Sequence, residues 1–369
     1  MTRAPRKTLL LALLIPGFPA LASSPQFDVQ AIPVPPGSTA DTPVVISADG
    51  AVLGGYSFIG DSSHASGIYE PALWQGTQAQ ILPVPAGDGG RVRGINGSTA
   101  VGIVAAGSSQ DQLSPAEWAG GQLQLLDTLG LPGGYAMDIN SSGTVAGVLT
   151  GPSGEQPVIW NGGVASKLGL PAGGTSGEVF GINNSGQVLV NAITGNVSTA
   201  WVWSNGMYTP IPSLSSSSQA GHGINSLGQV VGSGYLPNVE QPVGFLYSNG
   251  VTTALASFLG SYGDDPVAIN EAGEIVGDWN GPLGDRAALW VGGQAYDLTT
   301  LLPANSGWTL ESATDITPDG VIVGQGLFDG QQRGFELTPT ASPSAATPEP
   351  ASLAILTLGA TTLLRRRRR

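Results

Sequence analysis

Apolar and polar residues alternate along this chain in short runs separated by glycine-rich turns, and one such pattern recurs. An isoleucine is followed by a polar turn-forming residue, two more residues, a glycine and a short apolar run, as from Ile139 to Gly147. The anchoring isoleucines are Ile46, Ile95, Ile139, Ile182, Ile224, Ile269 and Ile316; the copies at Ile46, Ile95 and Ile316 are looser, and the one at Ile95 is shortened and lacks the spaced glycine. Their mean spacing of about 45 residues is typical of a four-stranded propeller blade. Seven copies of one unit are therefore predicted.

Each copy continues in the same way after a variable loop. One position near the end of the third predicted strand is aromatic in all copies but the last: Trp74, Trp118, Trp160, Trp203, Tyr247 and Trp290, with Leu337 in the seventh. A glycine turn such as Asn205-Gly206 follows, which is a strong hairpin signal, and then a fourth strand. A lone sheet of this size could not bury both faces, so neighbouring copies must pack against each other.

The two ends of the repeat region complement one another. The last copy stops after its third strand, at Gly334–Leu337, whereas Phe27–Val34 forms a fourth strand that precedes any anchor. Pairing of these two segments would close the ring and remove the free sheet edges. We predict an all-β, seven-bladed β-propeller of four-stranded blades, closed by the N-terminal strand pairing in the last blade. An open β-solenoid is the main alternative, but it would not need this overlap.

Composition supports this fold class and excludes several kinds of chemistry. The 369 residues include 56 glycines and 28 prolines, the two residues least favourable inside helices. With 41% hydrophobic residues the chain can still bury a substantial core. It contains no cysteine, which excludes a disulfide framework, a cysteine-ligated metal and a thiol nucleophile.

The repeats resemble the bacterial extracellular HAF repeats. Their unit reads roughly Gly-Ile-Asn-x-x-Gly-x-Val-x-Gly and then His-Ala-Phe-x-Trp; residues 181–188 and 223–232 match its first half. The His-Ala-Phe positions hold Thr199-Ala200-Trp201, Val243-Gly244-Phe245 and Arg333-Gly334-Phe335, so the histidine is missing. The resemblance covers residues 40–337 and implies an exported repeat protein. No function that depends on that histidine carries over.

The N-terminus has the features of a secretory signal peptide. Arg3, Arg6 and Lys7 precede an apolar run from Thr8 to Ile15. Cleavage is predicted after the small residues Ala20 and Ala22, so that the mature chain begins at Ser23. The apolar run is too short to favour a membrane anchor instead.

The C-terminus carries the features of a second targeting signal. Pro348, Glu349 and Pro350 are followed by 14 apolar residues and then by Arg365, Arg366, Arg367, Arg368 and Arg369. This order resembles a PEP-CTERM sorting signal, which implies retention in the inner membrane and recognition by an exosortase-type enzyme after export by the secretion machinery. As a helix the apolar run spans about 21 Å, short for a transmembrane helix, although arginine stems can extend it. The predicted organisation is a leader over 1–22, a propeller over 23–337, a linker over 338–348 and a sorting signal over 348–369.

Without the two signals, the predicted body is strongly acidic. Residues 23–346 keep only five of the basic residues but 25 of the acids. Nucleic acids and anionic lipid surfaces are poor partners for such a body. Most of these acids are interpreted as solvating the surface.

Acidic residues recur in the loops predicted to join second and third strands. These loops share one face with the connections between blades, and the residues proposed for a ligand face there are Asp61, Asp111, Glu155, Glu240, Asp278, Trp279 and Asp329. A ring of carboxylates could bind Ca²⁺ or a cationic partner, but the spacing matches no dedicated calcium loop. Solvation is the favoured interpretation, and no resident metal is assigned. Trp279 is the aromatic residue favoured for a surface contact.

The remaining candidates have structural interpretations. The recurring tryptophans are interpreted as core between blades rather than as a sugar-binding ladder. His222 is interpreted as an ordinary strand-edge residue, and His64 lies in a loop with serine and aspartate neighbours that rarely reach triad geometry. Asp138 and Asp315 each precede an anchor isoleucine and could face the channel mouth. No catalytic residue is assigned.

These observations predict an exported envelope or extracellular-matrix protein that acts as a non-enzymatic binding or structural module. Its expected partners are the sorting enzyme, the membrane through the C-terminal segment, and an extracellular polysaccharide or envelope component. The alternative is a carbohydrate-active propeller enzyme with carboxylates at the channel mouth, tested through Asp138 and Asp315. A surface-layer or stalk protein without a ligand is a third hypothesis.

Overall fold

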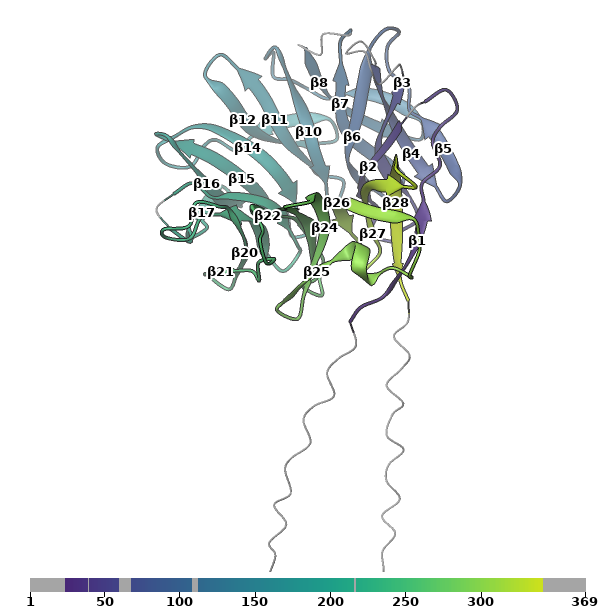
Figure 1. Cartoon of the computed structure of the whole chain (residues 1–369). Helices are drawn as coiled ribbons and strands as arrows, with labels where there is room; N and C mark the ends of the chain where they lie inside the picture. Colours follow the sequence, from purple (N-terminus) through teal and green to yellow (C-terminus); the bar gives the residue numbers. More distant parts are fainter. Residues whose placement is uncertain (1–23, 39, 60–67, 108–111, 216, 341–369) are drawn as a thin grey trace, which may run out of the picture. The chain divides into compact units, whose positions relative to one another are not determined.

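In a computed structural model that describes residues 24–38, 40–59, 68–107, 112–215 and 217–340, the chain forms a ring of blades (Figure 1). These residues form seven four-stranded antiparallel sheets, and Gln26–Thr340 is one compact unit. The seven-bladed propeller predicted from the repeats is confirmed. The predicted leader, sorting motif and arginine cluster lie outside the described residues, as do His64, Asp61 and Asp111.

We number the blades I to VII in chain order and give their strands from the channel outward. Blade I contains β2 (Ala40–Ile46), β3 (Leu53–Ile59), β4 (Ile68–Gln75) and β5 (Gln78–Ile81). Blade II contains β6 (Gly89–Asn96), β7 (Thr99–Ala105), β8 (Leu113–Ala119) and β9 (Gln122–Leu125). Blade III contains β10 (Gly133–Ile139), β11 (Val145–Gly151), β12 (Gly154–Asn161) and β13 (Val164–Lys167). Blade IV contains β14 (Gly174–Ile182), β15 (Val188–Thr194), β16 (Val197–Ser204) and β17 (Met207–Pro210).

The last three blades follow the same order. Blade V contains β18 (Ala220–Ile224), β19 (Val230–Gly234), β20 (Val243–Ser248) and β21 (Val251–Ala254). Blade VI contains β22 (Gly263–Ile269), β23 (Ile275–Gly281), β24 (Gly284–Val291) and β25 (Gln294–Asp297), followed by a short 3-10 helix, Leu298–Leu301. Blade VII contains β26 (Trp308–Ile316), β27 (Ile322–Phe328), β28 (Gln331–Pro339) and, as its outermost strand, β1 (Phe27–Ala31).

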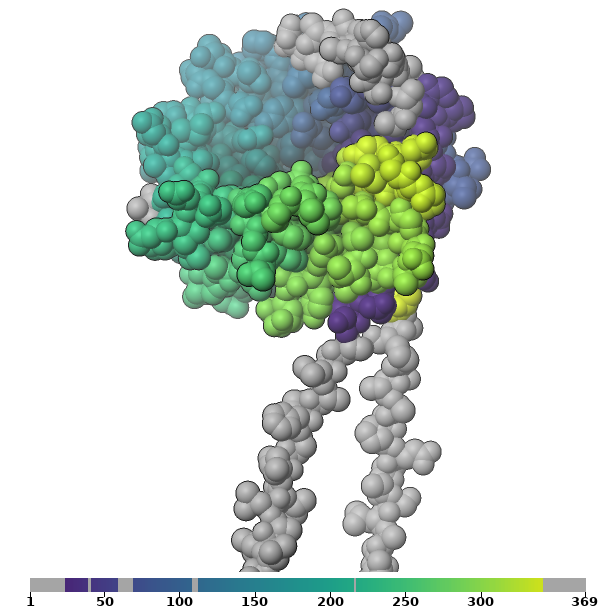
Figure 2. Space-filling model, in the orientation of Figure 1, coloured from purple at the N-terminus to yellow at the C-terminus, as the bar shows by residue number. Residues whose placement is uncertain are grey.

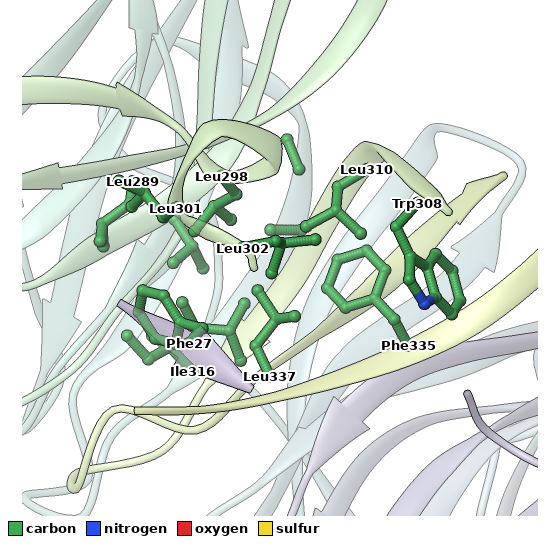
Figure 3. Packing of buried hydrophobic residues seen from close by; sticks show 14 residues of the cluster. Phe27, Leu289, Leu298, Leu301, Leu302, Trp308, Leu310, Ile316, Phe335 and Leu337 are labelled. Atoms are coloured by element: carbon green, nitrogen blue, oxygen red, sulfur yellow. The ribbon is translucent and has the colours of Figure 1, made fainter. Parts of the chain in front are cut away.

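The ring closes where its first and last strands meet. Strand β1 pairs antiparallel with β28, with Phe27 opposite Pro339 and Ala31 opposite Phe335. The amide of Ile32 extends the pairing to the carbonyl of Gly334 at 2.9 Å. Phe27 is buried beside Ile316 and Leu337 in the core of this blade (Figure 3). Side chains of successive blades fill the spaces between the ribbons along the outer wall (Figure 2).

The isoleucine-asparagine turn ties the blades that carry it to the blades that follow them. In four copies the asparagine side chain accepts hydrogen bonds from backbone amides two and four residues further on, and the glycine has positive φ. The side-chain amide then donates to the carbonyl of the equivalent residue in the following blade, from Asn140 to Asn183, from Asn183 to Asn225 and from Asn225 to Asn270. The repeated motif is therefore a turn and an interblade connection at once.

The recurring tryptophans form a second set of interblade connections. Trp74, Trp118, Trp160 and Trp290 are almost fully buried. Each indole nitrogen donates to a carbonyl in the segment that arrives from the preceding blade, at 2.7–2.8 Å. The interpretation of this series as core between blades is confirmed.

Within the described ranges, no helical segment has the length and apolar character needed to cross a membrane.

Candidate functional site

A central channel runs between the inner strands, and its lining is set by a repeated irregularity. In all seven blades the pairing of the first two strands skips one residue, two positions before the anchor isoleucine. Such a bulge turns an extra side chain out of the sheet. The bulged residues are Val44, Arg93, Met137, Phe180, His222, Val267 and Thr314, and all seven line one cavity of about 460 Å³.

A second cavity, of about 410 Å³, lies toward the isoleucine-asparagine turns. The two cavities share Val45, Asp138 and Asp315, so these residues mark the boundary between them. In the other blades the residue directly before the anchor isoleucine is small, because inner strands of neighbouring blades approach closely there. A Cβ on Gly94 would lie 2.6 Å from the Cα of Asp138, and one on Gly223 would lie 2.5 Å from a backbone oxygen.

Asp138 and Asp315 face this channel, as predicted from the sequence, but both oxygens of each carboxylate accept backbone hydrogen bonds. Asp138 accepts from the amides of Ile139 at 2.7 Å and Ile182 at 3.0 Å. Asp315 accepts from those of Ile316 at 2.8 Å and Ile46 at 2.9 Å. Burial raises the pKa of Asp138 to about 6 and that of Asp315 to about 7, although these amides oppose the shift. Each of the two carboxylates therefore connects its own blade to the next one.

The mouth of the larger cavity carries a histidine–carboxylate pair. Nδ1 of His222, on β18, lies 2.9 Å from Oδ1 of Asp265, on β22, and 3.1 Å from the carbonyl oxygen of Pro266. Burial lowers the pKa of His222, but the hydrogen bond and charge of Asp265 outweigh that effect and raise it overall. The ring also packs against Phe180, with centroids 5.8 Å apart. The interpretation of His222 as an ordinary strand-edge residue is therefore incomplete.

Arginine and tyrosine side chains of blades I to III pack together, and Arg93 among them lines the larger cavity. The Arg91 guanidinium lies over the rings of Tyr56 and Tyr69, at 5.0 and 4.2 Å from their centroids. Arg93 lies over the ring of Tyr135 at 5.5 Å, and burial lowers its pKa without removing its charge. These contacts place two cations in a body that is otherwise acidic.

The Tyr135 hydroxyl joins two carboxylates from neighbouring blades. It lies 3.2 Å from Oε1 of both Glu155 and Glu178. Burial, with these two negative charges, raises the pKa of Tyr135, and burial also raises that of Glu155. Glu155 is thus a predicted ligand-face residue that is linked through Tyr135 to Arg93 in the cavity lining.

The rest of the predicted acidic ring does not assemble among the described residues. Glu240 and Asp329 are exposed, and within the described ranges neither is hydrogen-bonded to Glu155 or Asp278. Asp278 belongs to β23 rather than to a loop, and burial raises its pKa to about 7. Within the described ranges, no group of three or more histidine, cysteine, aspartate or glutamate side chains is arranged to hold a metal ion.

Trp279 is not the surface residue expected from the sequence. Its ring stacks on Phe258 with centroids 4.6 Å apart and planes 8° apart, and its indole nitrogen is buried. The reason is that Trp279 follows Asp278 within β23, where alternate side chains pack against a neighbouring element.

Comparisons with known proteins support the fold. No family model and no curated protein matches the sequence. The β-propeller domain of the Trilobed protease from Pyrococcus furiosus is similar, with a TM-score of 0.60 and 8% identity over 82% of this chain and 95% of that one. An acylaminoacyl peptidase from Pyrococcus horikoshii matches with a TM-score of 0.54 and 7% identity, over 82% of this chain and 52% of that one.

A virginiamycin B lyase from Staphylococcus aureus is also similar, with a TM-score of 0.52 and 10% identity over 85% of this chain and 99% of that one. The prediction that the chain is not an enzyme is contradicted by these neighbours, which include peptidases and a lyase. That prediction relied on the absence of familiar catalytic motifs, and a propeller site gathered from separate blades leaves no such motif. At these identities the likeness shows the fold alone, a β-propeller.

Proposed function

We propose that the protein is exported and binds a polar extracellular ligand, a saccharide, at the channel mouth lined by the seven bulged residues. The observation that carries this proposal is the convergence of those residues from seven blades on one cavity. Ligand sites are concave, with apolar walls and a few placed polar groups. Met137, Phe180 and Val267 supply the walls, and Arg93 and His222 supply polar groups.

The charge of the body narrows the class of ligand. With five basic residues against 25 acids, residues 23–346 repel polyanions. A neutral saccharide carries no such penalty. Its hydroxyls can pair with Arg93 and Asp265, which line the cavity, and its apolar ring faces suit aromatic side chains such as Phe180.

A glycan-array screen of the full chain tests this proposal, followed by affinity measurements on the saccharides that bind. Replacing the channel-lining Phe180 in Phe180→Ala should weaken binding about tenfold, because an aromatic wall of the cavity is lost. Met207→Ala removes an apolar side chain that is 72% exposed on the outermost strand of the same blade, and it should leave affinity unchanged. Equal weakening in both variants, or no saccharide bound at all, would count against the site.

Export rests on the sequence signals. The protein recovered outside the cytoplasm should begin at Ser23, and Ala20→Asp together with Ala22→Asp should leave the leader attached. Mass spectrometry of the N-terminal peptide distinguishes the two forms. An uncleaved N-terminus in the wild-type protein would contradict the proposal of export through a cleaved leader.

A further inference from the structure

His222 is positioned as a base rather than only as a binding group. Nδ1 has two hydrogen-bonding neighbours, a carboxylate and a backbone carbonyl, and both accept. Nδ1 therefore carries a proton, and in the neutral ring the lone pair is on Nε2. No side chain or backbone group among the described residues is hydrogen-bonded to Nε2, and the side chain lines the larger cavity.

Arg93 supplies a cation in the same cavity with donors left over. Its Nε is buried without a hydrogen-bond partner, and Nη1 has only the weak acceptor Sδ of Met137, at 3.4 Å. Because Nε is closed to solvent, a ligand oxygen that carries or gains negative charge would meet this cation through its Nη groups. The bulges of blades II and V thus place a cation and a base around one volume.

Among the seven bulged residues, no hydroxyl is left free to act as a covalent nucleophile. Thr314 is the one bulged residue with a hydroxyl, and this hydroxyl lies 3.3 Å from the carbonyl oxygens of both Pro43 and Val323. The carboxylates of Asp138 and Asp315 are held by backbone amides. A base without a neighbouring nucleophile acts by activating water.

We propose that His222, oriented by Asp265, is the general base for hydrolysis of an acyl ester carried by the ligand at this mouth. Nε2 takes a proton from water while the water oxygen bonds to the ester carbonyl carbon. The carbonyl π electrons move to its oxygen, which Arg93 stabilises. Collapse of this intermediate breaks the bond to the alcohol oxygen, which takes the proton back from the imidazolium. One water and one ester give one acid and one alcohol.

This inference rests on the proposed ligand site, and the chain offers a matched control because it has only two histidines. Hydrolysis of 4-nitrophenyl acetate and of an O-acetylated saccharide by the full chain should fall about 100-fold or more in His222→Gln. His64→Gln should keep the wild-type rate. Wild-type activity in His222→Gln, or an equal loss in both variants, would overturn the assignment.

Asp265 acts through His222, so its test is the pH profile. The active form is the neutral ring, and the rate should rise with pH around a midpoint above the ordinary value of 6.5. Asp265→Asn should lower that midpoint and slow the reaction about tenfold. The charged groups that face the ring are Asp265 and Glu178 on adjacent inner strands, with Arg93, Asp138 and Asp315 on the same cavity.

Two measurements keep the inference independent of folding and of binding. NMR titration of the two histidine rings, assigned with His64→Gln, should show the His222 midpoint fall in Asp265→Asn; an unchanged midpoint would overturn the pairing. Because Gln keeps a polar group at this position, saccharide affinity in His222→Gln should fall far less than the rate of hydrolysis does. A wild-type protein that binds saccharides but hydrolyses no ester would refute the role of His222 as a base and leave the proposed binding function intact. Ester hydrolysis that depends on His222 in a protein that binds no saccharide would support the base and refute the proposed binding function.

Discussion

Two tryptophans at the same position in different blades differ in one hydrogen bond. Trp160 donates from its indole nitrogen to the carbonyl of Asp127 at 2.7 Å, whereas the equivalent nitrogen of Trp203 is buried without a partner. Replacing Trp160 by phenylalanine leaves that carbonyl unmet, whereas replacing Trp203 removes an unmet donor. Trp160→Phe should therefore lower the free energy of unfolding by roughly 1–3 kcal/mol more than Trp203→Phe. Urea unfolding measures the difference, and equal losses would show that the indole bond contributes nothing.

Single residues also mark where prediction from the sequence ended. The tryptophan series and the asparagine turns could be predicted because each recurs in several copies with one chemistry. The channel residues could not, because the bulged position holds six different kinds of side chain in the seven blades, from Val44 to Thr314. His222 occupies the position of Met137, Phe180 and Val267, which made a structural role the natural interpretation. Its carboxylate partner is 43 residues away on another blade, beyond any local pattern.

At the scale of elements, repeat length and strand order could be predicted, but loops could not. The anchor isoleucines all fall at or next to the ends of inner strands. This could be predicted because the alternation of apolar and polar residues in a strand, and the glycine of the turn that follows it, are local properties of the sequence. The prediction that the acidic residues lie in loops was wrong for Asp278, which lies inside β23. The boundary of a strand depends on its pairing partner rather than on its own residues.

The strand that closes the ring yields a prediction of its own. Phe27 is the buried residue through which β1 packs on blade VII, and it is 4% exposed. Phe27→Ala should cost roughly 3–5 kcal/mol of unfolding free energy, because a large ring leaves a packed core. Phe328→Ala removes the same ring from a position that is 38% exposed in the same blade, and it should cost far less. Urea unfolding compares the two, and a Phe27 variant as stable as the Phe328 variant would mean that closure by β1 adds little stability.

At the scale of the whole molecule, the buried acids all shift in one direction. Burial raises the pKa of Asp41 and Asp138 to about 6 and that of Asp278 and Asp315 to about 7, from an ordinary value of 3.8. Between 3.8 and these values the folded chain binds more protons than the unfolded chain, so acidification favours folding. The raised pKa of His222 acts in the same sense, because the stability that its proton contributes is lost as the pH rises through that value.

The free energy of unfolding should therefore rise as the pH falls from 8 to 6, by on the order of 1 kcal/mol for each of Asp278 and Asp315. Repulsion among the excess acids adds to the same trend, and variants separate the two causes. Asp315→Asn should flatten the pH dependence, whereas Asp329→Asn, which removes an exposed charge at a left-handed position that asparagine tolerates, should keep the wild-type slope. Thermal unfolding at a series of pH values tests this, and a melting temperature that drops on acidification from pH 8 to 6 would show that the buried carboxylates are paired in a way that these contacts do not include.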